Sequence, residues 1–167
     1  MIELEIAKSK EEIVKIANLG FVIWQEYYTA IIGEEQVKYM LQKFQTEEAI
    51  HDQLKEGYEY FTILYNSLGV GYLACIVQEN SLFLSKIYVL KKFRGNGIGK
   101  YCLNFLIQKG KNLKLVDISL SVNKYNEDSI LFYKKYGFKN IDAQIKDIGG
   151  GFIMDDYKMV KKIENTF

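Results

Sequence analysis

A glycine-rich segment near the middle of the chain most constrains how the chain can fold. The segment Arg94-Gly95-Asn96-Gly97-Ile98-Gly99-Lys100 follows a strand-like run over residues 82–90 and precedes a helix-like run over residues 100–107. Glycines at alternate positions let the backbone turn sharply with several amide N–H groups pointing inward, and the helix start adds the positive end of its dipole. The segment therefore predicts a strand, a loop and a helix that together bind a diphosphate.

The spacing excludes the two commonest phosphate-binding loops. A P-loop ends in Gly-Lys-Ser/Thr, but here Arg94 stands at its first position and Tyr101 at its last, so no hydroxyl is placed to ligate magnesium and no metal is expected. The dinucleotide fingerprint is also excluded, because Gly95, Gly97 and Gly99 have the wrong step. A glycine-rich turn before a helix is also common as a plain connection, so the loop alone leaves both interpretations open.

A second segment further along the chain decides between them. Arg94, Gly97 and Gly99 fit the pattern Arg/Gln-x-x-Gly-x-Gly/Ala. The segment from Asn126 to Phe138 fits Asn-x-x-Ala-x-x-Phe-Tyr-x-x-x-Gly-Phe, with Ser129 in place of the alanine. In this order and spacing the two patterns resemble the acetyl-CoA loop and the second signature of the GNAT superfamily of acyl-CoA N-acyltransferases. Because serine and alanine are both small, we expect the departure to be tolerated.

The resemblance implies that acetyl-CoA is the cofactor and indicates which residues bind it. In the family the pantetheine arm pairs with the backbone of the strand before the loop, like an added strand. The expected cofactor-binding residues are Ile87, Tyr88, Val89, Arg94, Gly95, Asn96, Gly97, Ile98, Gly99, Lys100, Asn126, Ser129 and Tyr133. Asn126 before two acidic residues is also a good helix N-cap, and the two roles can coexist.

The resemblance also implies that Tyr133 is a catalytic general acid, since its family counterpart points its hydroxyl at the cofactor sulfur. A tyrosine ordinarily titrates near 10 and a thiol near 8.5, so proton delivery to the thiolate is uphill by about 2 kcal/mol. Tyr133 is therefore expected to assist the reaction without being indispensable. The sequence marks no general base: His51, the only histidine, lies in a polar helical pattern, and Glu79 only ends a strand.

Family members usually shape the acceptor site with the first two helices and the final hairpin. Here the segments 24–44 and 149–159 are similar, more loosely, to the subgroup of bacterial polyamine (spermidine/spermine) acetyltransferases. Aromatic and acidic side chains can bind a cationic amine by cation–π and charge contacts. The expected acceptor-binding residues are Trp24, Glu26, Tyr27, Tyr28 and Asp155. A core role fits Trp24 and Tyr28 equally, because they recur at helical spacing.

The sequence thus predicts an N-acetyltransferase that moves the acetyl group of acetyl-CoA to a primary amine of a small molecule by direct attack in a ternary complex. Polyamines are one acceptor class, and peptide or protein amines are another. A noncatalytic module that binds or senses acyl-CoA is the alternative from a different class. A nucleotide-binding protein is disfavoured because no serine or threonine follows Lys100.

Length and composition narrow the class further. With 167 residues and no proline or low-complexity linker, the chain is expected to form a single domain over residues 1–167. A net charge of +1 argues against binding to nucleic acid or an acidic membrane. No apolar stretch is long enough to span a bilayer and no signal peptide is visible, so a cytoplasmic location is expected. Cys75 and Cys102 lie in apolar patterns and are expected to be reduced, buried thiols.

The periodicity predicts an α/β (α+β) fold with a mixed, mostly antiparallel twisted sheet of about seven strands flanked by helices. The expected order is a strand at 1–7, a helix from Ser9 to Gly33, helices at 34–44 and 46–57, strands at 58–65 and 70–77, the strand and helix around the loop, a strand at 116–122, the helix of the second signature, and a hairpin of 138–148 and 152–160. On the first helix Ile13, Ile16, Ala17, Phe21 and Trp24 are expected to share the buried face. An exposed final hairpin would offer an edge for a homodimer.

Overall fold

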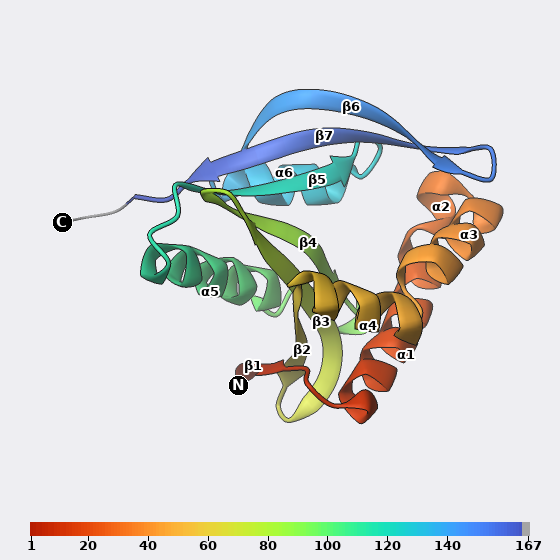
Figure 1. The fold of residues 1–167 in the computed structure, drawn as a ribbon, viewed down its shortest axis with the longest axis horizontal. Helices are drawn as coiled ribbons and strands as arrows, with labels where there is room; N and C mark the ends of the chain where they lie inside the picture. Colours follow the sequence, from red (N-terminus) through yellow and green to blue (C-terminus); the bar gives the residue numbers. More distant parts are fainter. Residues whose placement is uncertain (165–167) are drawn as a thin grey trace. The chain divides into compact units, whose positions relative to one another are not determined.

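The computed structural model describes residues 1–164, and its secondary structure follows the predicted order (Figure 1). The elements are β1 (Ile2–Ile6), α1 (Lys10–Tyr27), α2 (Thr29–Ile32), α3 (Glu34–Phe44), α4 (Glu47–Glu56), β2 (Glu59–Tyr65), β3 (Leu68–Gln78), β4 (Ser81–Val89), the 3₁₀ turn η1 (Lys91–Phe93), α5 (Ile98–Asn112), β5 (Asp117–Asn123), α6 (Glu127–Lys135), β6 (Lys139–Gly149) and β7 (Phe152–Lys162).

The strands form one sheet in the order β1-β2-β3-β4-β5-β7-β6. β4 and β5 run parallel, whereas β1 with β2, β2 with β3, β5 with β7 and β6 with β7 run antiparallel. The predicted fold class, a mostly antiparallel sheet of seven strands with flanking helices, is therefore confirmed.

The chain divides into two compact units. The first unit contains residues 1–76 and 86–103, and the second contains residues 77–85 together with the chain from Asn104 onward. The glycine-rich loop belongs to the first unit and the second signature to the second unit. The expectation of a single domain over residues 1–167 stays a prediction. Within residues 1–164 no helix is both long and apolar enough to cross a membrane.

The first helix begins where the sequence predicts, but it ends earlier. Ser9 caps it through a reciprocal capping box, because Ser9 Oγ accepts from the Glu12 amide at 3.2 Å and Glu12 Oε2 accepts from the Ser9 amide at 2.7 Å. The prediction of one helix reaching Gly33 is wrong, because α1 ends at Tyr27 and the short α2 follows. Gly33 has a φ of 86°, a backbone conformation that favours glycine.

One predicted core residue of α1 is exposed instead. Phe21 keeps 55% of its surface accessible, whereas Ile13, Ile16 and Trp24 are buried as expected. The neighbouring Gly20 takes the inward position, since a Cβ on Gly20 would lie 2.8 Å from the Tyr72 hydroxyl. The missing side chain at position 20 therefore lets a buried tyrosine lie against the helix, a contact that the periodicity of large apolar residues does not reveal.

The remaining helices of the first unit match their predicted ranges closely. α3 covers the predicted 34–44, and Thr46 caps α4 by accepting from the Ala49 amide at 3.1 Å. The predicted hairpin turn between β2 and β3 is a two-residue turn at Asn66 and Ser67, whose φ values are 50° and 66°. Cys75 and Cys102 are both buried and form no disulfide, as predicted, and burial raises the pKa of Cys102 to about 12.

In the second unit, β7 lies between β5 and β6 and forms the long final hairpin with β6 (Figure 1). The hairpin turns through Gly149, Gly150 and Gly151, which all have positive φ, as the glycine triplet predicts. β6 is the outermost strand at this end of the strand order, and Ile141 and Ile145 on it are 59% and 68% exposed. A homodimer through this edge stays a prediction.

Candidate active site

The glycine-rich segment forms an exposed loop between η1 and α5. Gly95 and Gly97 have φ values of 81° and 77°, in the left-handed region that glycine adopts without strain. A Cβ on either residue would have no other atom within 4 Å. The two glycines are therefore required by the backbone conformation and not by packing, and the space beside them is open.

Helix α5 begins earlier than the sequence predicts, at Ile98 instead of Lys100. The Tyr101 amide donates to the Gly97 carbonyl at 3.0 Å. The amides of Ile98, Gly99 and Lys100 therefore occupy the first turn of the helix, where N–H groups have no acceptor within the helix. Unsatisfied amides at the positive end of a helix are suited to an anion.

The charge around the loop has one sign. Residues 91–100 contain Lys91, Lys92, Arg94 and Lys100 and no acidic residue. All four cationic side chains are exposed, and Asn96 Nδ2 closes the loop by donating to the Phe93 carbonyl at 2.9 Å. An open, positively charged loop with oriented amides fits the diphosphate of a nucleotide cofactor.

The end of α1 contacts the flanks of this loop. The Arg94 guanidinium lies 4.6 Å from the centroid of the Tyr27 ring, and its Nε donates to the Val89 carbonyl at 3.0 Å. Glu26 Oε2 accepts from the Lys91 amide at 3.3 Å. Glu26 and Tyr27, which the sequence assigned to the acceptor, thus make contacts with residues around the loop. Acceptor binding by either residue stays a prediction.

The strand before the loop, β4, has two different faces. Ile87 and Val89 pack into an apolar cluster that contains Ile98, the first residue of α5. Tyr88 faces the other way, with its ring centroid 5.5 Å from that of Trp24 and 6.0 Å from that of Tyr28. The stretch Ile87 to Val89, assigned to cofactor binding, is thereby fixed on both sides by side-chain packing.

Glycine at position 71 allows β3 to approach β4 unusually closely. A Cβ on Gly71 would lie 2.1 Å from the Tyr88 carbonyl oxygen, a distance no real structure tolerates. The Leu90 amide donates to the Val70 carbonyl at 2.9 Å next to this point. Gly71 therefore sets the backbone position at Tyr88. The signal was an isolated glycine within a strand pattern, which the sequence reasoning did not use.

Trp24 and Tyr28 form the centre of an aromatic cluster at the end of α1. Their rings stack with centroids 4.3 Å apart, and Trp24 is only 4% exposed, whereas Tyr28 is half-buried. Tyr88 packs edge-on against both rings. The core role that the sequence left open for Trp24 fits its burial. Tyr28 is the more accessible of the two rings.

Lys86 is a buried ammonium that the sequence reasoning missed. It is 7% exposed, and its Nζ donates to the Phe44 carbonyl at 3.1 Å, to Gln53 Oε1 at 3.2 Å and to the Tyr60 hydroxyl. Burial lowers the pKa of Lys86 to about 7. The alternation along β4 could have indicated this burial, because Leu82, Leu84 and Lys86 occupy every second position and all three are buried.

The second signature forms α6 and its N-cap. Asn126 Oδ1 accepts from the Ser129 amide at 3.3 Å, which confirms the capping role of Asn126. Tyr133 is 7% exposed, and its ring centroid lies 5.4 Å from those of both Phe132 and Phe138. The conspicuous aromatic residues of this signature thus hold Tyr133 within the second unit.

These features were compared with known proteins. The sequence profile described as the acetyltransferase (GNAT) family matches residues 21–138, which include both the loop and the second signature. The chain belongs to this family. It is therefore an acyltransferase, and acetyl-CoA is the acyl donor of its family.

Several known proteins are similar to this GNAT chain over nearly its whole length. The spermidine N(1)-acetyltransferase of Thermoplasma acidophilum is 23% identical over 158 residues, which cover 91% of this chain and 96% of the relative. The crystal structure of PaiA N-acetyltransferase from Thermoplasma acidophilum in complex with coenzyme A has a TM-score of 0.78 at 22% identity and covers 97% of this chain and 99% of that one. The ribosomal-protein-S18-alanine N-acetyltransferase of Escherichia coli has a TM-score of 0.71 at 16% identity and covers 100% and 97%. These structural likenesses show the fold.

The remaining site candidates of the GNAT chain lie in three places. Asp155 forms an ion pair with Lys124 at 2.6 Å in the second unit. His51 is exposed on α4, as predicted, and Glu79 is exposed in the turn between β3 and β4. Neither of the latter two is enclosed by other residues as a base in a closed active site would be.

Replacing Gly97 with alanine in this GNAT protein is expected to weaken acetyl-CoA binding by about tenfold or more. Alanine at a φ of 77° is strained by roughly 1–2 kcal/mol, so the loop relaxes and its amides turn away. Gly33→Ala is the matched control, because Gly33 has a φ of 86° and equally open surroundings but lies outside the loop. Calorimetry should show similar losses of unfolding free energy in both variants and lower acetyl-CoA affinity only in Gly97→Ala. Equal affinities would contradict the assignment of the loop.

Proposed function

We propose that this chain transfers the acetyl group of acetyl-CoA to a primary amine of a small molecule, by direct attack of the amine within a ternary complex. The observation that carries the proposal is the loop. Gly95 and Gly97 hold a left-handed backbone beside open space, and α5 begins directly after them. In a member of the GNAT family, such a loop is our candidate for the site that binds the diphosphate of acetyl-CoA.

Different residues would bind the diphosphate and the pantetheine arm of acetyl-CoA. The amides from Ile98 to Lys100 and the side chain of Arg94 would bind the diphosphate. The terminal nitrogens of the Arg94 guanidinium make no hydrogen bond within residues 1–164, so they can donate to an anion. The main chain of Ile87, Tyr88 and Val89 would pair with the pantetheine arm. When bound, acetyl-CoA supplies a thioester carbonyl that an amine can attack.

Residues of the second signature complete the proposed chemistry. Tyr133 would donate its hydroxyl proton to the departing thiolate. Asn126 holds the first turn of α6 through its cap to Ser129, and both residues are proposed to contact the cofactor. These roles rest on the family's motif and on the residues that match it.

For the acceptor we propose a polyamine as the first class to test. The similarity to a spermidine acetyltransferase over 91% of the chain supports this choice. The half-buried ring of Tyr28 could receive a cationic chain by a cation–π contact. Asp155 is already paired with Lys124, so an amine that binds Asp155 must compete with that lysine.

A peptide or protein amine is the second candidate. The structure of the ribosomal-protein-S18-alanine N-acetyltransferase also matches this chain over its full length, and the name of that enzyme specifies a protein amine as the acceptor. Peptide N-termini and lysines therefore belong in the same test. The alternative to an enzyme is a protein that binds or senses acyl-CoA without catalysing acetyl transfer.

The test is mass spectrometry of polyamines, amino acids, aminoglycosides and short peptides after incubation with acetyl-CoA and the purified protein. Mass detection reads the acetylated amine itself and needs no thiol reagent. Acetylated spermidine or spermine would establish both the class and the acceptor. An acetylated peptide would keep the enzyme and replace the acceptor. Acetyl-CoA binding without any acetylated amine would favour the sensor.

A further inference from the structure

Strand β5 is polar on the side of the sheet that carries Asp156 of β7. Residues directly opposite each other in an antiparallel pair point to the same side of a sheet. Asp156 on β7 lies opposite Asn123 on β5 and opposite Gln144 on β6. Ser119 and Ser121 share the face of Asn123, whereas the apolar side chains of β5 occupy the other face.

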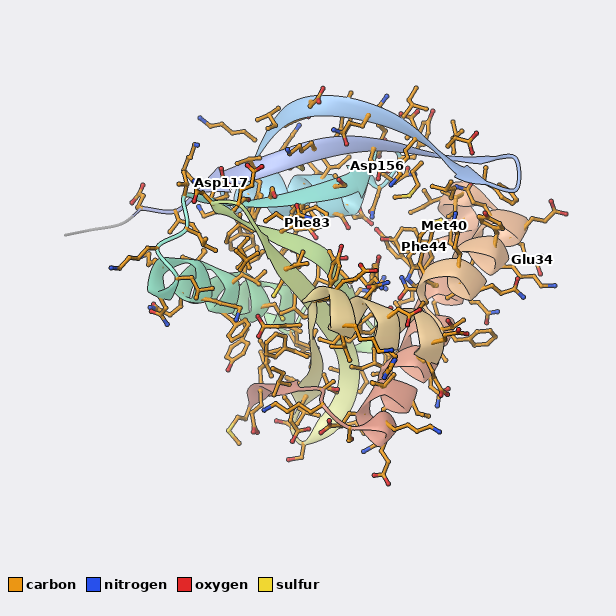
Figure 2. All side chains as sticks on the ribbon, viewed as in Figure 1. Glu34, Met40, Phe44, Phe83, Asp117 and Asp156 are labelled. Atoms are coloured by element: carbon orange, nitrogen blue, oxygen red, sulfur yellow. The ribbon has the colours of Figure 1, made fainter. Side chains whose placement is uncertain are left out.

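Asp156 is buried on this face without a partner. It is 8% exposed, and its carboxylate makes no hydrogen bond or ion pair within residues 1–164. Two other aspartates on β5 and β7 are paired: Asp155 with Lys124 at 2.6 Å, and Asp117, at the far end of the strand pair, with Lys162 at 3.7 Å. Figure 2 labels Asp156 on β7 and Asp117 at the start of β5. Asp156 keeps only a little contact with water, and an ionised carboxylate in such a place without a partner destabilises the fold, which points to a ligand of opposite charge.

The charged groups near Asp156 do not neutralise it. On the same face, Lys158 follows on β7, and Asp142 and Lys146 lie on β6 opposite positions 158 and 154. Both β6 residues are exposed. Burial, and then the charge of Asp155, raises the pKa of Asp156 to about 6. Asp156 is therefore ionised at neutral pH and is a stronger base than an exposed carboxylate.

We propose that Asp156 binds the ammonium group of the acceptor and accepts the proton that the amine must lose before attack. This inference rests on the proposed function and supplies the general base that the sequence does not mark. One proton passes from the ammonium to the Asp156 carboxylate and from there to water. The nitrogen lone pair then forms the C–N bond as the C–S bond breaks, and the second nitrogen proton ends on the released thiol.

The decisive variant is Asp156→Asn, which keeps the shape of the side chain and removes its charge and basicity. With the amine identified in the acetylation panel, kcat/KM for that amine should fall by about 100-fold or more, while the Kd for acetyl-CoA stays within about twofold. Asp156→Glu should recover at least about tenfold of the loss, because it restores a carboxylate. Asp117→Asn removes a paired aspartate from the same face and should change amine kinetics by less than about threefold.

Thermal unfolding gives a second readout that does not depend on any substrate. A carboxylate whose folded pKa is raised disfavours the folded state once it ionises, so wild-type stability falls as the pH rises through about 6. Asp156→Asn should therefore unfold several degrees above wild type at pH 8, and this difference should shrink as the pH falls from about 6 to the ordinary aspartate value of 3.8.

The outcomes separate this role from the function on which it rests. Amine kinetics within about threefold of wild type in Asp156→Asn would overturn the role of Asp156 and leave the acetyltransferase intact. A large loss of acetyl-CoA binding in that variant would also overturn it, because the residue would then serve the cofactor or the fold. Equal unfolding temperatures at pH 8 would contradict an unpaired buried charge. A wild-type protein that acetylates no amine would overturn the proposed function and this role together.

Discussion

Tyr133→Phe is expected to lower kcat by between about tenfold and several hundredfold while the KM for acetyl-CoA changes little. The hydroxyl is proposed to protonate the departing thiolate, and removing a general acid typically costs rates of this order. The loss should stop short of inactivation, because a thiolate leaves fairly well without protonation. The measurement is steady-state kinetics with varied acetyl-CoA and a saturating amine.

Because the packing around the Tyr133 ring is kept in Tyr133→Phe, a change in turnover reports the loss of the hydroxyl. Its ring lies between Phe132 and Phe138, each with a centroid 5.4 Å away, and phenylalanine keeps those contacts. Tyr136→Phe is the matched control, because Tyr136 ends the same helix and packs against Phe132 at 4.9 Å. Equal turnover in Tyr133→Phe and wild type would remove Tyr133 from the mechanism. A comparable loss in Tyr136→Phe would indicate that the helix is disturbed in both variants.

Local chemistry explains why so much of the fold could be predicted. Ser9 and Thr46 indicate helix starts, because their side chains accept hydrogen bonds from nearby amides. The glycines at 149–151 indicate a turn, because glycine adopts positive φ values without strain. Such signals lie within a few residues of the feature they specify. The order of elements and the fold class followed from them.

Local patterns were insufficient where a distant residue decides the local outcome. Phe21 is exposed because Tyr72, far along the chain, lies against Gly20. Glu26 and Tyr27 contact Lys91 and Arg94, and no periodicity within α1 indicates that its end meets the loop. These contacts depend on tertiary packing, which overrides the local pattern.

The glycine-rich backbone of the candidate site could be predicted from the sequence, but the buried charged side chains could not. Gly95 and Gly97 have the positive φ values that the glycine-rich segment predicts, because few other residues adopt that backbone conformation without strain. Lys86 and Asp156 sit at ordinary-looking positions in strands, and only their burial distinguishes them from surface residues. Charged residues are buried so rarely that sequence reasoning assigns them to the surface by default.

Lys86 leads to the second large expected effect, which concerns stability. Its three acceptors, the Phe44 carbonyl, Gln53 Oε1 and the Tyr60 hydroxyl, are all uncharged. Burial lowers the pKa of Lys86 from 10.5 to about 7 in the folded state. Between those values the unfolded chain binds more protons than the folded one, so stability rises with pH. Relative to Lys86→Met, the wild-type unfolding free energy should rise by up to about 4 kcal/mol from pH 7 to pH 10.

Chemical denaturation of both proteins at pH 7, 8.5 and 10 isolates this effect, because every other titrating group is common to the two chains. Lys55→Met, measured at the same three pH values, is the control for deleting an ammonium group, since Lys55 is exposed on the same helix that supplies Gln53. Parallel pH curves for wild type and Lys86→Met would show that the three acceptors hold the ammonium charged across the whole range. A rising curve would show that burial outweighs them. Lys86, which lies on the proposed cofactor strand β4, would then lose its charge just above neutral pH.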